Sequence, residues 1–64
     1  MKFQNLDAVI ALIDFPSHGV LKGDLGAIVH IHNQGEAYEV EFVDMLGHTK
    51  AMFSVYPNQI AKMK

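Results

Sequence analysis

Histidines offer the most obvious chemistry in this chain of 64 residues, which contains four histidines and no cysteine. His30 and His32 alternate within an apolar run that is typical of a β-strand, so both side chains should leave the strand on one face. The strand register described below places Glu39 beside His30, and imidazole and carboxylate groups both bind zinc. His30, His32 and Glu39 are therefore candidate metal ligands, although an ordinary solvated sheet face explains the pattern more simply.

Nucleophilic catalysis requires a nucleophile beside a base, and neither Ser17 nor Ser54 lies in a motif of that kind. The segment Gly23-Asp24-Leu25-Gly26 lacks the lysine of a phosphate-binding loop, and its aspartate would repel phosphate. Asp24 fits better as a turn residue that accepts backbone N–H groups. We therefore expect no enzymatic activity, no catalytic residue and no cofactor.

Apolar residues at positions that should be exposed suggest a binding surface instead. Met45 and Leu46 fall at a predicted hairpin tip, and Ile28 and Met52 are predicted to face outward, Met52 beside Glu39. Exposed apolar residues of this kind often mark an interface. The alternative is that the hairpin folds over the end of the barrel and buries Leu46.

The loop over residues 14–22 is a second candidate surface. Its Phe15, together with Tyr56 and Pro57, could form an aromatic groove that receives an extended peptide. The simpler alternative is that Phe15 and Leu21 only cap the barrel. The predicted partner-binding residues are thus Phe15, His18, Leu21, Ile28, Met45, Leu46, Met52 and Tyr56.

Composition narrows the classes of partner and compartment. The net charge is −2 and all five basic residues are lysines. Nucleic-acid binders instead present a concentrated basic surface rich in arginine, so nucleic acid is a poor candidate partner. Disulfides and thiolate zinc sites are excluded, and the absence of cysteine fits a reducing cytoplasm. The apolar run over residues 8–13 is too short for a signal peptide or a membrane span.

Short runs rich in Val, Ile, Phe and Tyr alternate with glycine-containing turns, a pattern typical of a β-sandwich or barrel. We expect one domain over residues 1–64, all-β, with the architecture of a five-stranded SH3-like barrel. The expected strands cover residues 8–13, 27–32, 37–43, 48–55 and 60–63, with a 3₁₀ turn over 56–59. A C-terminal helix over 56–64 is the alternative for the last segment, because Pro57 fits a first helical position.

Two hairpins can be aligned on paper. With Gln34 and Gly35 at the first tip, paired residue numbers sum to 69, so Val29 faces Val40 and Ile28 faces Glu41. With Met45 and Leu46 at the second tip, the sum is 91, so Val40 faces Ala51, Tyr38 faces Phe53 and Glu41 faces Lys50. Both alignments place Tyr38, Val40 and Phe42 in the core, which favours an antiparallel meander.

Two segments carry a family resemblance. Pro16, Gly19, Gly23, Asp24 and Gly26 follow an apolar first strand, and residues 37–42 read Ala-Tyr-Glu-Val-Glu-Phe. Together these resemble a bacterial family of similar length, domain of unknown function 4926, over about residues 6–62. The resemblance implies an SH3-like barrel and small accessory or antitoxin-like proteins encoded beside larger partners.

The leading hypothesis is therefore a non-enzymatic module that binds a partner protein or a second copy of itself. An antitoxin-like or immunity-like role beside a neighbouring gene product is one specific form. An RNA-binding barrel of the KOW type and a histidine-based metal-binding protein are the alternatives.

Overall fold

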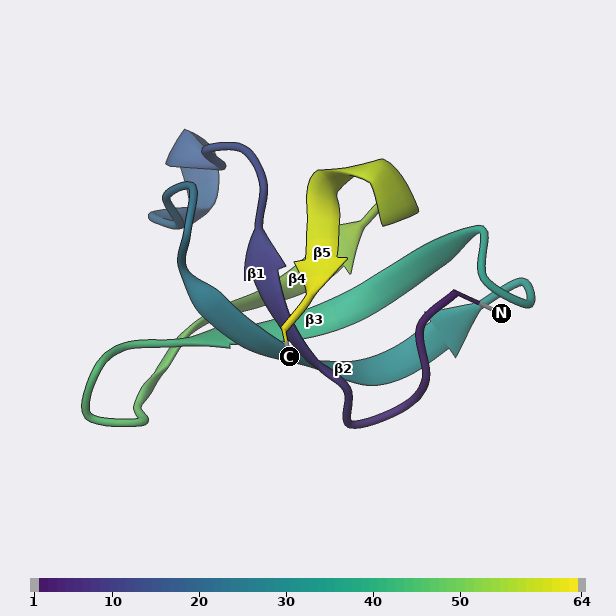
Figure 1. Cartoon of the computed structure of the whole chain (residues 1–64). Coiled ribbons are helices and arrows are strands. Elements are labelled where there is room, and N and C mark those ends of the chain that lie inside the picture. Colours follow the sequence, from purple (N-terminus) through teal and green to yellow (C-terminus); the bar gives the residue numbers. More distant parts are fainter. Residues whose placement is uncertain (1, 64) are drawn as a thin grey trace.

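The computed structural model describes residues 2–63, so the first and last residues of the predicted domain lie outside the described part. Its elements are β1 (Ala8–Ala11), η1 (Pro16–His18), β2 (Leu25–His32), β3 (Ala37–Val43), β4 (Thr49–Val55), η2 (Pro57–Gln59) and β5 (Ile60–Lys62) (Figure 1). The predicted all-β fold and the 3₁₀ turn before the last strand are confirmed. The alternative C-terminal helix is wrong, because Ile60 returns to extended backbone and pairs with Ala11 of β1.

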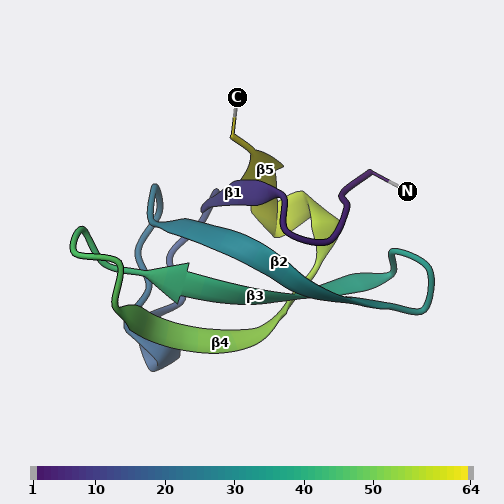
Figure 2. The same ribbon diagram turned by 90° about the horizontal axis from the view of Figure 1, so that it is seen from below.

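The five strands form one antiparallel sheet in the order β4-β3-β2-β1-β5. The long strand β2 contributes to both layers of the barrel. Its first half pairs with β1 along one edge and with β3 along the other, whereas its second half pairs with β3. Figure 2 shows β1 and β5 on one side of β2, and β3 and β4 on the other. Strands β4 and β5 are the two ends of the order, so the SH3-like barrel is a curled sheet that hydrogen bonds do not close.

The core lies between the two layers. Tyr38, Val40 and Phe42 of β3 are each at most 1% exposed, as predicted, and the Tyr38 ring packs edge-on against Phe3. The other core residues are apolar and come from β1, β2, β4, β5 and the loop between β1 and β2: Val9, Ala11, Val20, Ile28, Val55 and Ile60. Burial of this apolar surface is the main driving force for folding.

The pairing of β2 with β3 corrects one predicted site residue. His30 pairs with Glu39 and Ile31 with Tyr38, as predicted, but the register then shifts and Ile28 pairs with Val40. A bulge at Val29 inserts one extra residue into β2, and a one-residue shift moves every following side chain to the other face. Ile28 is therefore 0% exposed in the core, and its prediction as an outward partner-binding residue is wrong.

The pairing of β3 with β4 differs from the prediction by two residues. Val40 pairs with Phe53 and Glu41 with Met52, so the predicted partners Ala51 and Lys50 are wrong. The turn is longer than predicted because Asp44 Oδ1 accepts hydrogen bonds from two backbone N–H groups, those of Leu46 and His48. A shift of two residues preserves the faces, so Met52 still points outward, opposite Glu41 rather than beside Glu39.

The glycine-rich turn before β2 behaves as the sequence predicts. Asp24 Oδ2 accepts the backbone N–H of Leu21 at 2.9 Å, and Gly23 has a φ of +94° that disfavours other residues. Lys50 Nζ lies 2.6 Å from the same Asp24 oxygen, so Lys50 forms an ion pair with Asp24 instead of the predicted pair with Glu41. Neither helix among the described residues, each a single 3₁₀ turn, has the length or apolar character to span a membrane.

Candidate functional site

Strand β1 is apolar on both of its faces. Val9 and Ala11 point into the core, whereas Ala8 and Ile10 point away from it. The register places Leu25 of β2 on one side of Ile10 and Ala61 of β5 on the other, and directly opposed residues of paired strands share a face. The outward side of this layer is therefore built from apolar side chains.

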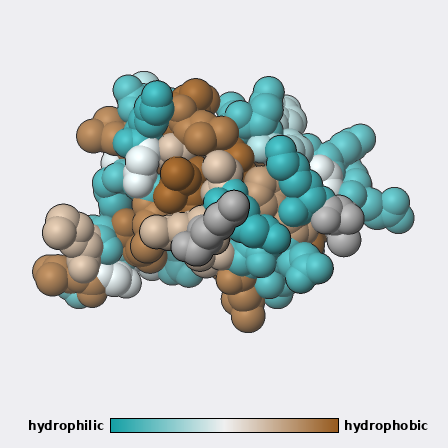
Figure 3. All heavy atoms as spheres, viewed as in Figure 1, coloured by the Kyte–Doolittle hydropathy of each residue, from teal (hydrophilic) through white to brown (hydrophobic). Residues whose placement is uncertain are grey.

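We call this surface the outer face and define it as Ala8, Ile10, Leu25, Ala27 and Ala61. None of the five is buried, and Leu25 is 40% exposed. Leu12 and Met63 extend the apolar surface at the ends of the strands, at 38% and 49% exposure. Figure 3 views the molecule from this side and shows hydrophobic surface beside the C-terminus and at the hairpin tip.

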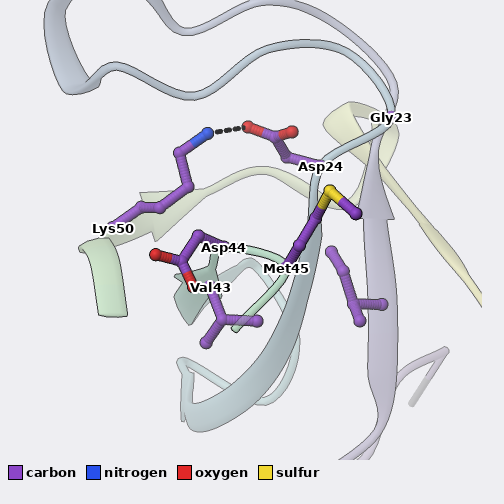
Figure 4. A pocket seen from close by; sticks show the side chains of 7 residues that line it. Gly23, Asp24, Val43, Asp44, Met45 and Lys50 are labelled. Carbon is purple, nitrogen blue, oxygen red and sulfur yellow. Dashed lines mark hydrogen bonds and ion pairs between the residues drawn. The ribbon is translucent and has the colours of Figure 1, made fainter. Parts of the chain in front are cut away.

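A pocket of about 460 Å³ adjoins the outer face. Leu25 belongs to both, and Val43 of β3 is paired with Leu25 beneath the pocket. Figure 4 shows Lys50 and Asp24 joined along one side, with Met45 extending from the β3–β4 turn beside them. The full lining is Gly23, Asp24, Leu25, Val43, Asp44, Met45 and Lys50. The pocket thus combines an apolar floor with an ion pair at its rim.

The tip of the β3–β4 hairpin is the most exposed apolar segment. Met45 is fully exposed and Leu46 is 81% exposed, so the alternative in which the hairpin folds over and buries Leu46 is wrong. Hydrogen bonds from the backbone N–H groups of Leu46 and His48 to Asp44 Oδ1 fix the conformation of the turn. Met45, predicted as a partner-binding residue, therefore lines the pocket, whereas Leu46, predicted likewise, is exposed at the hairpin tip and does not line the pocket.

Asp24 is the principal acid at the pocket. The Leu21 backbone N–H, and then the Lys50 ammonium, hold its pKa below the ordinary value of 3.8. A carboxylate with a lowered folded pKa stabilises the protein above its ordinary pKa, and this stabilisation is lost as the pH falls through the folded value. Part of the resistance to acid unfolding should therefore depend on Asp24.

The variant Asp24→Asn should lose less stability than the natural chain on acidification. Thermal midpoints followed by circular dichroism between about pH 6 and pH 2 measure this difference. Lys50→Met serves as the matched variant and should flatten the curve less, because the hydrogen bond from Leu21 remains. Parallel acid profiles for the natural chain and Asp24→Asn would contradict the assignment.

The loop between β1 and β2 covers the core rather than forming a groove. Phe15 is half-buried and packs against Phe42 and Phe53, and the His18 ring stacks on Phe53 at 3.8 Å between centroids. Leu21 stays 58% exposed, so Phe15 caps the barrel as the simpler alternative predicted and Leu21 does not.

Tyr56 does not complete the predicted aromatic groove. The ring is 64% exposed and stacks with no other aromatic ring in the described part of the chain. The backbone N–H of Tyr56 donates to Gln59 Oε1 and so begins η2. Its structural role is therefore to start the last turn, while the ring is left on the surface.

A cluster of polar side chains that we call the histidine cluster lies on the opposite layer, on the outward side of β2, β3 and β4. Its members are His30, His32, Glu39 and Ser54. Glu39 Oε1 accepts a hydrogen bond from the Ser54 hydroxyl at 2.7 Å and lies 3.4 Å from His32 Nε2. The Ser54 hydroxyl, followed by His32, holds the pKa of Glu39 below its ordinary value. The His30 ring lies edge-on to the His32 ring at 4.8 Å.

This cluster has the geometry of neither a metal site nor a catalytic triad. His30, His32 and Glu39 do not come together as a set of ligands, and no three His, Asp or Glu residues among residues 2–63 do so. Ser54 and Glu39 both approach the same nitrogen of His32, whereas a catalytic triad needs the nucleophile and the acid on opposite ring nitrogens. The arrangement is that of a hydrogen-bonded surface cluster.

Sequence reasoning missed Ala8, Ile10, Leu25, Ala27 and Ala61. The available signal was the nearly unbroken apolar run over residues 8–13, since strands with both faces covered read as continuous apolar runs. Leu25 and Ala61 carry no such signal, because only their pairing with Ile10 brings them to the same surface.

Comparison with known proteins identifies the family but offers no characterised relative. No curated protein and no solved structure matches the chain. A family model described as a domain of unknown function (DUF4926) matches residues 5–62, which covers nearly the whole sequence and includes every strand and both 3₁₀ turns. The chain therefore belongs to the DUF4926 family.

Proposed function

We propose that this protein is a non-enzymatic interaction module that docks a protein on the outer face and the adjoining pocket. The observation that carries the proposal is the two-sided apolar character of β1, whose outward residues Ala8 and Ile10 are covered by no other layer within residues 2–63. Contiguous exposed apolar surface rimmed by charged groups marks interaction sites on small proteins. The Asp24–Lys50 pair supplies such a rim.

The hairpin tip supports the same proposal. Met side chains adapt to irregular surfaces and are common at binding sites, and Met45 stands beside the pocket. An accessory role of the antitoxin or immunity type, with the partner encoded by a neighbouring gene, is the specific form we favour. A small domain with one apolar docking face suits a role in which the partner performs the chemistry.

Co-expression of the tagged protein with the products of the neighbouring genes tests this function. The natural chain should capture one of these proteins, and Ile10→Glu should reduce the captured amount by at least about tenfold, because an interface would desolvate the new carboxylate. Gln34→Glu is the matched control, since Gln34 is exposed in the turn between β2 and β3, outside the outer face and outside the predicted partner-binding residues. Equal capture by all three chains, or capture by none, would contradict the proposal.

A further inference from the structure

We infer that β4 pairs edge to edge with β4 of a second copy of this chain, antiparallel about a two-fold axis at Met52. This inference goes beyond the proposed function, because it concerns a different strand and leaves the outer face available to a partner protein. Within residues 2–63, no backbone hydrogen bond joins β4 to any segment other than β3. Figure 2 shows β4 at the margin of its layer, beyond β3.

The two free edges of the sheet differ in how they are protected. Strand β5 has three residues, follows a turn that begins at Pro57 and ends at Lys62, and short length, proline and lysine all discourage pairing with another chain. Strand β4 has seven residues without proline or glycine, and its bulge and its one charged residue, Lys50, both lie near its beginning. The edge over residues 51–55 therefore has none of these protections, and its backbone N–H and C=O groups are complementary to another strand.

The exposed side chains of β4 lie along this edge. Thr49, Lys50 and Ser54 are exposed, and Met52 is 58% exposed, whereas the alternate residues of the strand point towards the core. Met52 is the middle residue of the seven, so an axis at Met52 pairs the whole length of the strand with its copy. The two Met52 side chains would then lie side by side on one face of a sheet that continues through both copies.

The charge pattern of β4 favours antiparallel pairing with itself. About an axis at Met52, Lys50 of one copy lies opposite Ser54 of the other, and the two Lys50 positions are about 13 Å apart along the strands. Glu39 pairs with Ser54 within each copy, so Lys50 of the other copy approaches a group of opposite charge. Parallel pairing in register would instead set Lys50 against Lys50, and directly opposed like charges are destabilising.

The dimer should be weak, because its contact is a single pair of strands. A standard stable interface buries about 800 Å² per partner, whereas one strand edge buries less, as in transient complexes. We therefore expect a dissociation constant between about 10 μM and 1 mM, so that dilute solutions contain monomers. Association by this edge then depends on the local concentration of the chain.

Sedimentation equilibrium between about 10 μM and 2 mM is the first test. The natural chain should pass from the monomer mass to twice that mass, and Met52→Lys should raise the dissociation constant at least about tenfold, because two ammonium groups meet at the axis. Within its own chain the new lysine lies opposite Glu41, which favours folding. Gln34→Lys, in the exposed turn between β2 and β3, should associate as the natural chain does. A natural chain that stays monomeric throughout overturns the inference.

A charge exchange separates loss of pairing from loss of folding. An equimolar mixture of Met52→Lys and Met52→Glu should associate at least about tenfold more tightly than either variant alone, because opposite charges then meet at the axis. A mixture that associates no better than its two components overturns the position of Met52 at the axis.

Disulfide formation tests the same position without adding charge. The natural chain has no cysteine, so Met52→Cys introduces a single thiol. Directly opposed Cα atoms of an antiparallel pair are about 4.5–5.5 Å apart, within the range of a disulfide, so mild oxidation should link Met52→Cys into dimers. Ser54→Cys should stay largely unlinked, because its two positions lie about 13 Å apart along the strands. Faster linking of Ser54→Cys than of Met52→Cys overturns the axis.

The outcomes for self-association and for docking are distinguishable. Ile10→Glu lies on the outer face and should dimerise as the natural chain does, although it should capture less of the neighbouring gene product. A monomeric natural chain that still captures that protein overturns only the pairing of β4. A chain that dimerises with the expected disulfide and captures no protein supports the pairing and contradicts only the proposed function.

Discussion

Replacement of Ile28 by alanine should leave the protein largely unfolded at room temperature. Ile28 is 0% exposed and pairs with Val40 at the centre of the core. Truncation of a buried isoleucine to alanine costs about 2–5 kcal/mol, since the apolar contacts are lost and a cavity remains. That cost is comparable to the roughly 3–5 kcal/mol that a core of this size supplies. Urea unfolding at one fixed chain concentration should show the transition moving to near zero denaturant.

Met52→Ala is the matched control for this substitution. The sequence predicts both Ile28 and Met52 to face outward, and the structure places only Met52 there, at 58% exposure. Its truncation should change the free energy of unfolding by no more than about 0.5 kcal/mol, as for most surface substitutions. Similar losses from the two variants would mean that the bulge at Val29 is misplaced and that Ile28 is not in the core.

Replacement of Gly26 by alanine is the second substitution with a large expected effect. A Cβ atom at this position would lie 2.7 Å from Val40 Cγ1, 2.9 Å from the carbonyl oxygen of Glu41 and 3.0 Å from Phe42 Cδ1. The backbone oxygen belongs to the paired strand β3, so it cannot move without disturbing the ladder between β2 and β3. We expect a loss of at least about 1–3 kcal/mol, the usual cost of overpacking a core.

Gly47→Ala is the control, because Gly47 has open space around its Cβ position and a φ of +84°. Its expected cost of about 1–2 kcal/mol comes only from the left-handed backbone conformation. The two variants should also differ in which part of the structure is disturbed. Chemical shifts in β3 should change for Gly26→Ala and not for Gly47→Ala, and an undisturbed β3 in Gly26→Ala would contradict the close approach.

The register of β2 shows which strand pairings the sequence predicts and which it does not. Alternation and turn chemistry place His30 and Ile31 correctly, because both lie between the turn and the bulge. The bulge itself follows no sequence signal in the segment around Val29. It arises because β2 must bend to pair with β1 at one end while continuing along β3 at the other. Ile28 therefore lies in the core rather than at the predicted surface position, because a tertiary constraint sets the register.

The pocket and the outer face illustrate the same limit. Asp24 was predicted as a turn residue and is one, since its hydrogen bond to Leu21 is local. Its ion pair with Lys50 joins residues 26 positions apart and follows from the actual length of the β3–β4 turn. Likewise Leu25 and Ala61 flank Ile10 only because β2 and β5 pair with opposite edges of β1.

Sequence patterns alone predict the family, the five short strands, the 3₁₀ turn before β5 and the inward residues of β3. These features depend on local alternation, on turn residues and on apolar runs, all of which act over a few neighbouring positions. The burial of Ile28, the Lys50–Asp24 ion pair and the outward apolar face of β1 become visible only in the folded structure. Those outcomes depend on a bulge, a turn length and strand pairings between distant segments, which local patterns do not specify.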